Sequence, residues 1–241
     1  MNSRIRFLAI ALIGFAAALP AAAADETASP SALEQQLAGM RRPYDAYRWR
    51  IPMISSVESF MLGFQYRAWA HSGLGLSLEG SLRGTPSRAN LRSDAEWAGY
   101  TSGGLALQYW IEQEMRLVPM VTGLRFGVGV LGTAYSLLFA GGSSTDVASS
   151  GGLLFTVAGY ATLPLASYLV NRPAGRWWPH LQVEISCLFE GFGDMRNTRD
   201  YDLDGDGIVD HVNGEEFRDP SGKNPKGAFI SSLRFGLVWI L

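Results

Sequence analysis

Long stretches of this chain alternate between apolar and polar residues with a period of two. In residues 73–83, GLGLSLEGSLR, leucines alternate with glycine, serine and charged residues. Residues 101–112 and 181–189 follow the same rule. Because successive side chains of a strand point to opposite faces, this period predicts β-strands with one apolar and one polar face.

The expected strands are about 10–14 residues long, whereas strands of globular proteins are most often about 5–6 and a bilayer needs about 9–11. Small residues lie on the polar face, which suits a narrow lumen. Aromatic residues at bilayer interfaces are typical of transmembrane barrels, and the expected strand ends carry Trp69, Tyr109, Trp177, Trp178 and Trp239. A sheet in lipid must close on itself, so we expect an all-β, antiparallel, transmembrane up-and-down barrel. A periplasmic lipocalin-like barrel, apolar inside, is the alternative.

Short and long connections alternate along the chain, as periplasmic turns and extracellular loops do. Short turns are expected near His71, near Gln113 and at 171–178, and long loops at 84–98, 139–152 and 194–226. Seven strands are expected at 57–70, 73–83, 99–112, 116–137, 153–169, 179–193 and 228–241. An even number requires one more, and residues 43–54 supply it, with Pro43 and Pro52 tolerable at strand ends or bulges. The expected barrel therefore has eight strands.

Residues 43–241 resemble the small eight-stranded outer-membrane proteins of the OmpA, OmpX and OmpW type, in strand pattern and in the ending RFGLVWIL. The resemblance implies the outer membrane of a Gram-negative bacterium, with outer-membrane lipid and the barrel assembly machinery as partners. The ending is similar to an assembly signal, with Phe235, Leu237, Trp239 and Leu241 at alternate positions. That family usually ends in an aromatic residue, and Leu241 departs from the pattern.

The first residues predict export from the cytoplasm. Residues 1–24 combine two arginines, a short apolar run and an alanine-rich cleavage site, which is typical of a secretory signal peptide. Residues 25–42 would form a periplasmic leader, in which 31–40, SALEQQLAGM, predicts a short helix with a capping box. A disordered leader is the alternative. The net charge of −2 does not favour nucleic-acid binding, and the single cysteine, Cys187, excludes an internal disulfide.

The parity of the expected strands places charged side chains inside the barrel. An eight-stranded barrel is just wide enough for side chains to fill it. Lone buried charges are costly, so these charges must be paired. A structural salt-bridge core that blocks flow is the main interpretation, and a narrow path for small solutes or a small-ligand pocket is the alternative. The interior charges are expected to be Arg67, Glu79, Arg83, Glu112, Arg125, Glu184, Glu190 and Arg234.

Residues 200–216, DYDLDGDGIVDHVNGEE, form the most acidic stretch of the chain. Their core, DLDGDGIVD, resembles the calcium loops of thrombospondin type 3 repeats and the first half of an EF-hand loop. A glycine-permitted turn points alternate carboxylates at one hard cation, and a backbone carbonyl can add a ligand. At position 12 Asn213 replaces the bidentate glutamate of EF-hands, and Glu215 or Glu216 could substitute for it. The expected Ca²⁺ ligands are Asp202, Asp204, Asp206, Ile208 and Asp210. A solvated acidic loop is the alternative.

Three functions are compatible with this pattern: a structural or surface-interaction barrel with a calcium-binding extracellular loop, a channel for small solutes, and a lipid A-modifying enzyme. The stretch PYDAYRWRIP resembles the opening of the lipid A palmitoyltransferases. That family needs a histidine in its first membrane strand, and here the only histidines are His71, His180 and His211. No pair of a base and a hydroxyl is marked in the sequence, so no catalytic residues are predicted.

Overall fold

The computed structural model describes residues 35, 48–84, 95–115, 120–139, 142–164, 179–202 and 204–240. The strands are β1 Trp49–Ser55, β2 Ser59–Trp69, β3 Ser72–Gly84, β4 Ala95–Glu114, β5 Val121–Phe139, β6 Ser144–Leu163, β7 Pro179–Phe192, β8 Arg196–Asn197 and β9 Gly227–Ile240. The expected signal peptide, leader and helix lie outside the described residues, apart from Gln35.

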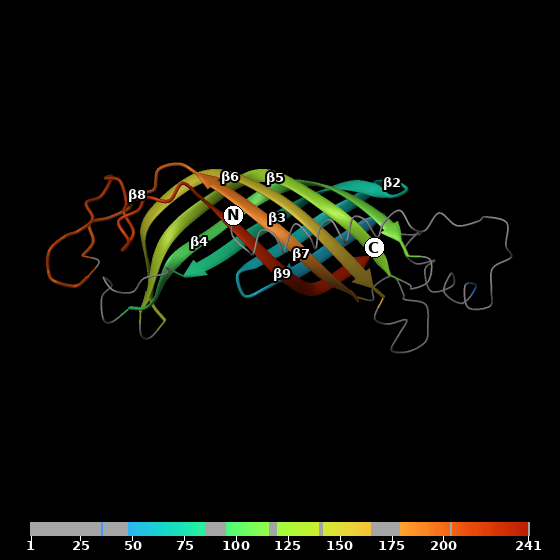
Figure 1. Ribbon diagram of the computed structural model, residues 1–241, viewed down its shortest axis with the longest axis horizontal. Helices are drawn as coiled ribbons and strands as arrows, with labels where there is room; N and C mark the ends of the chain where they lie inside the picture. Colours follow the sequence, from blue (N-terminus) through green and yellow to red (C-terminus); the bar gives the residue numbers. More distant parts are fainter. Residues whose placement is uncertain are drawn as a thin grey trace.

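Each long strand pairs antiparallel with its neighbour in the sequence, and β9 pairs with both β7 and β1. The ring is therefore closed by eight long strands (Figure 1). The two-residue β8 lies outside this ring and pairs with β6. The prediction of an all-β, antiparallel, eight-stranded up-and-down barrel is confirmed. The segment between β7 and β9 lies at one end of the barrel, called the loop end below, and the C-terminus lies at the opposite end.

The prediction of a long loop at 139–152 is wrong. Strands β5 and β6 remain paired up to Leu138 and Ser144, so most of this range is strand. Gly142 has a φ of 81° in the short connection between them, a conformation that glycine adopts at little cost. The expected strand 153–169 therefore begins earlier, at Ser144. Strand β6 is described to Leu163, and residues 165–169 lie outside the described part of the chain.

The first expected strand, 43–54, corresponds to β1, Trp49–Ser55, and residues 43–47 lie outside the described part of the chain. Pro52 lies in the middle of β1, not at a strand end. It pairs with Val238 of β9, whereas the β1–β2 ladder has a gap at Ile51 and Pro52. Because proline has no N–H, it interrupts the ladder on one side only. The ring still closes through β9.

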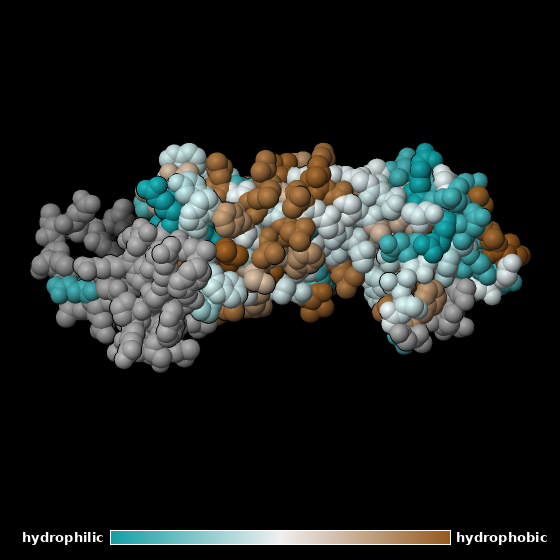
Figure 2. All heavy atoms as spheres, turned by 180° about the vertical axis from the view of Figure 1, so that it is seen from behind, coloured by the Kyte–Doolittle hydropathy of each residue, from teal (hydrophilic) through white to brown (hydrophobic). Residues whose placement is uncertain are grey.

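A belt of exposed apolar side chains crosses the middle of the barrel on the face seen in Figure 2, and every strand of the ring contributes exposed apolar residues. Its members are between 45% and 66% exposed and include Phe64, Leu76, Leu107, Val130, Leu153, Phe189 and Leu233. Trp49, Trp69 and Tyr109 are 40% to 56% exposed near the opposite end. A contiguous apolar surface of this kind marks contact with another apolar phase or partner. Within the described residues, no helix is long and apolar enough to cross a membrane.

Candidate functional site

Four charged side chains fill the centre of the barrel. Arg125 on β5 donates to Oε1 of Glu79 on β3 at 2.7 Å and to Oε1 of Glu184 on β7 at 2.6 Å. Arg234 on β9 lies 3.5 Å from Glu79 and 3.4 Å from Glu184. All four side chains are fully buried. Two positive and two negative charges therefore neutralise each other in this central layer.

A second charged layer lies towards the opposite end. Glu112 on β4 accepts a hydrogen bond from Arg50 at 2.5 Å and another from Arg67. The Arg50 guanidinium lies over the rings of Trp110 at 5.4 Å and Tyr160 at 5.5 Å. A cation over aromatic faces is stabilised by the negative ring surface. Arg50 therefore anchors β1, which has the fewest residues of the eight strands in the ring, to β4 and β6.

The third layer lies on the loop side of the centre. One carboxylate oxygen of Glu190 accepts hydrogen bonds from the hydroxyls of Ser81, at 2.7 Å, and Ser102. Its other oxygen lies 3.4 Å from Arg83, whose side chain keeps 23% exposure. Together the three layers bring all eight predicted interior charges into the lumen, six of them fully or almost fully buried and Arg67 and Arg83 partly exposed.

Arg50 is an interior charge that the predicted set does not include, although the sequence carries a signal for it. In the stretch 43–54 the apolar Trp49 and Ile51 alternate with Arg48 and Arg50. The parity rule that was applied to the other strands places Arg50 inside, and its exposure is 2%. The described lumen thus contains five arginines among its ion pairs where four were predicted.

The loop end of the lumen is apolar, and the segment between β7 and β9 closes it. Phe217 and Met195 of this segment are fully buried. The Phe217 ring lies 4.8 Å from the ring of Tyr135 on β5. These side chains pack in one cluster with inward residues of the barrel wall, including Leu131, Leu154, Leu188 and Ile230. We call residues 194–226 the cap.

The cap is also held by a polar contact with the wall. The hydroxyl of Tyr100 on β4 donates to Oδ2 of Asp219 at 3.1 Å. Oδ1 of Asp219 accepts from the hydroxyl and backbone N–H of Ser221 and from the N–H of Lys223. Partial burial alone would raise the pKa of Asp219, but these hydrogen bonds lower it below 3.8. The charged form of Asp219 therefore stabilises the docked cap.

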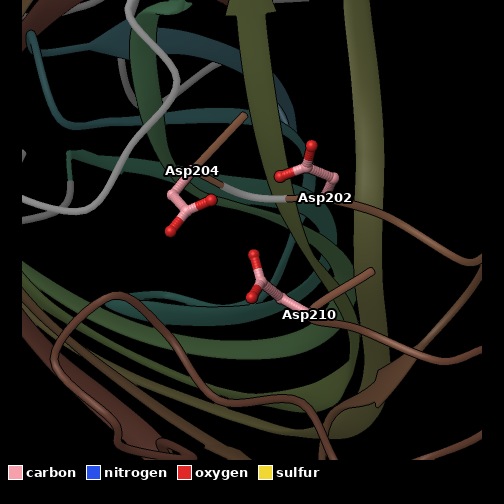
Figure 3. Close-up of side chains that lie close together, drawn as sticks. All are labelled: Asp202, Asp204 and Asp210. Carbon is pink, nitrogen blue, oxygen red and sulfur yellow. The ribbon is translucent and has the colours of Figure 1, made fainter. Parts of the chain in front are cut away.

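The acidic turn lies in the cap, beyond the barrel. Asp202, Asp204 and Asp210 each place a carboxylate oxygen within 4.8 Å of the others, and the three side chains point towards one another (Figure 3). Oxygens that share one Ca²⁺ at about 2.3–2.6 Å lie at most about 5 Å apart. The spacing of these three carboxylates therefore fits a single hard cation.

The other two predicted ligands are placed differently. Asp206 lies outside this group of three, and its Oδ1 accepts the N–H of Ile208 at 2.8 Å. Asp202 accepts N–H groups from Gly205 at 2.6 Å and Gly207 at 2.9 Å, which tightens the turn. Both glycines have positive φ, 83° and 89°, so a side chain at either position would strain the turn.

The three histidines lie far apart in the sequence and in different environments. His71 is an exposed residue of the turn between β2 and β3, and His180 is buried in β7. His211 lies in the cap, with its ring 5.3 Å from that of Phe217. Burial lowers the pKa of His211, and the adjacent Asp210 opposes this change. These positions do not favour a shared catalytic centre.

No protein-family model, curated protein or solved structure matches the chain.

Proposed function

We propose that this protein is an integral β-barrel of the outer membrane of a Gram-negative bacterium, with a structural or surface-interaction role and a calcium-binding extracellular loop. The observation that carries the proposal is that the barrel has apolar side chains on its outer face and charged side chains in its interior. Phe64, Leu107 and Phe189 are 45% to 66% exposed outside, while Glu79 and Arg125 are fully buried inside. Fully burying a Leu or Phe side chain stabilises it by about 1.5–3 kcal/mol. These half-exposed side chains would gain the remaining part of that free energy in lipid, so a lipid environment stabilises the outer face.

The filled lumen favours a structural role over a channel. The central layer of Glu79, Arg125, Glu184 and Arg234 spans four strands with no exposed side-chain area. The apolar cap adds a second closure at the loop end. A path for solutes would need both to open, and opening the central layer would separate buried opposite charges at high cost.

The proposal also predicts how the barrel is oriented across the outer membrane. The cap would lie outside the cell, and the C-terminal end of β9 would lie at the periplasmic face together with the aromatic residues Trp69 and Tyr109. The positions of Phe235, Leu237 and Trp239 on β9 are consistent with the assembly signal: Phe235 is 51% exposed and the other two are partly exposed. Leu241 lies outside the described residues.

Membrane placement can be tested by expressing the full chain in a Gram-negative host and fractionating the envelope. The expected result is recovery with the outer membrane and a gel mobility that changes on heating, as a folded barrel unfolds. Intact cells that carry Val57→Cys or Arg199→Cys should react with a membrane-impermeant maleimide. Recovery in the soluble periplasm would refute the proposal.

The calcium part is supported by the convergence of Asp202, Asp204 and Asp210 and by the D-x-D-x-D-G spacing. Calorimetry of the purified barrel is expected to show one Ca²⁺ per chain. Asp204→Ala should weaken binding at least tenfold, whereas the matched change Glu58→Ala, in the turn between β1 and β2, should leave it unchanged. If calorimetry detects no heat of Ca²⁺ binding by the folded wild-type barrel, the calcium-binding proposal is rejected. The proposal of membrane insertion is unaffected by that result.

A further inference from the structure

The cap carries a small apolar surface of its own. Ile208, Val209 and Val212 are 67%, 51% and 45% exposed. Figure 2 shows apolar side chains at the loop end, surrounded by hydrophilic ones and apart from the belt. We call these three residues the apolar tip. An apolar centre with a charged rim is the composition of many protein interfaces.

The base of the apolar tip is held by backbone hydrogen bonds and by packing against Phe217. The N–H of Tyr201 donates to the carbonyl of His211 at 2.8 Å, and the N–H of His211 donates to the carbonyl of Tyr201 at 3.0 Å. His211 is buried against Phe217, which is itself fully buried in the barrel mouth. The tip is therefore connected through the cap to the barrel wall. A pre-organised surface loses less conformational entropy on binding than a flexible loop does.

The negative charge around the apolar tip favours a partner with basic groups. The stretch 200–216 contains seven carboxylates and no lysine or arginine. Asp204, Asp206 and Asp210, next to the tip, are all exposed. One bound Ca²⁺ would leave this stretch negative. Like charges would repel an anionic lipid surface or the same tip of a second copy, whereas basic groups would be attracted.

We infer that the apolar tip, Ile208, Val209 and Val212, is a docking surface for a partner protein that offers an apolar pocket rimmed by lysine or arginine. This inference adds a partner to the proposed surface-interaction role and rests on that role. The aliphatic side chains would enter the pocket, and the carboxylates would pair with the basic rim. Electrostatic attraction across the rim would set the rate of association and its salt dependence.

The test uses the full barrel in nanodiscs of zwitterionic lipid and two fluorescent probe peptides. Both peptides carry the same number of lysines, and they differ in having leucines or serines at the remaining positions. After subtraction of the signal from empty nanodiscs, the leucine peptide should bind at least tenfold more tightly than the serine peptide. Raising the salt from about 50 mM to about 500 mM should weaken both.

Matched variants locate the surface. Ile208→Ser with Val209→Ser should reduce binding of the leucine peptide to that of the serine peptide. Val57→Ser, which removes a 94% exposed apolar side chain elsewhere, should have no effect. Asp204→Asn with Asp206→Asn should reduce the salt dependence, which provides a second readout should the serine variant fold poorly. Folding of each variant is checked by its heat-dependent gel mobility.

Other outcomes would overturn the inference. Equal binding of the leucine peptide by the wild type and by the Ile208→Ser, Val209→Ser variant would exclude the tip. Tip-dependent association with vesicles of anionic phosphatidylglycerol, or tip-dependent dimers without peptide, would replace the basic protein by lipid or by a second copy. Recovery of the barrel in the outer membrane together with a peptide-binding failure would leave the membrane proposal standing.

Discussion

Glu79 on β3 and Arg125 on β5 lie 2.7 Å apart, and neither side chain is exposed. Each residue depends on further partners: Glu79 also accepts from the Thr156 hydroxyl at 3.0 Å, and Arg125 also bonds Glu184. Burial of single charges is expensive, and only a complete set of partners offsets that cost. The central layer therefore specifies which strands lie opposite one another across the lumen.

Removal of Arg125 should strongly destabilise the barrel. Arg125→Ala leaves Glu79 and Glu184 buried with Arg234 as their remaining cation, and the loss of one partner from a buried ion pair costs about 3–5 kcal/mol. Urea unfolding in detergent or lipid vesicles, followed by gel mobility, measures the change in free energy. The control Arg199→Ala removes an exposed arginine of the cap and should change stability by less than about 0.5 kcal/mol. A loss below about 1 kcal/mol for Arg125→Ala would contradict the role given to this layer.

The closed lumen predicts an absence of steady conductance in planar bilayers. Wild-type protein should give no stable ohmic step. Phe217→Ala should give none either, because the central layer with Glu79 and Glu184 remains closed below the cap. A steady wild-type conductance that disappears with Glu184→Gln would instead support the narrow-channel alternative.

Much of the fold was readable from the period-two pattern, because a barrel that is apolar outside and polar inside repeats the same alternation in every strand. Residues 73–83 and 179–193 agree closely with β3 and β7. The interior charges follow from the same parity, and Arg50 would have followed as well. The alternation within each strand is sufficient to predict which way these side chains point, because each of them faces either the apolar outside or the polar lumen.

The loop end was not predictable in this way, because the polarity of the two faces reverses there. Tyr135 and Leu137 are fully buried in the apolar cluster at the loop end, and Ser136 between them is also buried, with its hydroxyl donating to Asp146 at 2.6 Å. The apolar wall at this level requires apolar contacts from the cap, chiefly Phe217. Contacts between segments so far apart in the sequence leave no periodic signal in either segment, and the pattern of 139–152 therefore predicts a loop where the structure has strand.

The geometry of the acidic turn ranks two aspartates that the sequence motif treats alike. Asp204 belongs to the converging group with Asp202 and Asp210, whereas Asp206 does not. Asp204→Ala should therefore weaken Ca²⁺ binding more than Asp206→Ala, by about tenfold, or about 1.4 kcal/mol. Calorimetry of the two variants under identical conditions measures the difference. An equal loss of Ca²⁺ affinity in the two variants would mean that Asp204 and Asp206 both bind the ion, as the sequence motif predicts and the converging group of three does not.

Phe217 is expected to control the docking of the cap and not the integrity of the barrel. Phe217→Ala removes a fully buried ring, a change that costs about 3–5 kcal/mol in packed cores. Hydrogen exchange of the Asn197 and Phe217 amides, which bond within the cap, should accelerate about 100-fold or more. Strand amides of β2 and β3 should keep their protection. The matched change Val212→Ala, at a 45% exposed position, should leave the cap amides unaffected.

Docking of the cap should also weaken in acid through Asp219. Its pKa in the docked cap lies below the ordinary 3.8, so the undocked segment binds a proton at a higher pH than the docked one does. The stabilisation is therefore complete above about pH 3.8 and is lost as the pH falls through the lower, docked pKa. NMR of the Ser221 and Lys223 amides between about pH 5 and about pH 2 should show this transition. Asp219→Asn should remove the transition, and Tyr100→Phe should shift it upwards, because the Tyr100 hydroxyl donates to the charged carboxylate. An unchanged transition in Asp219→Asn would assign the acid sensitivity to another group.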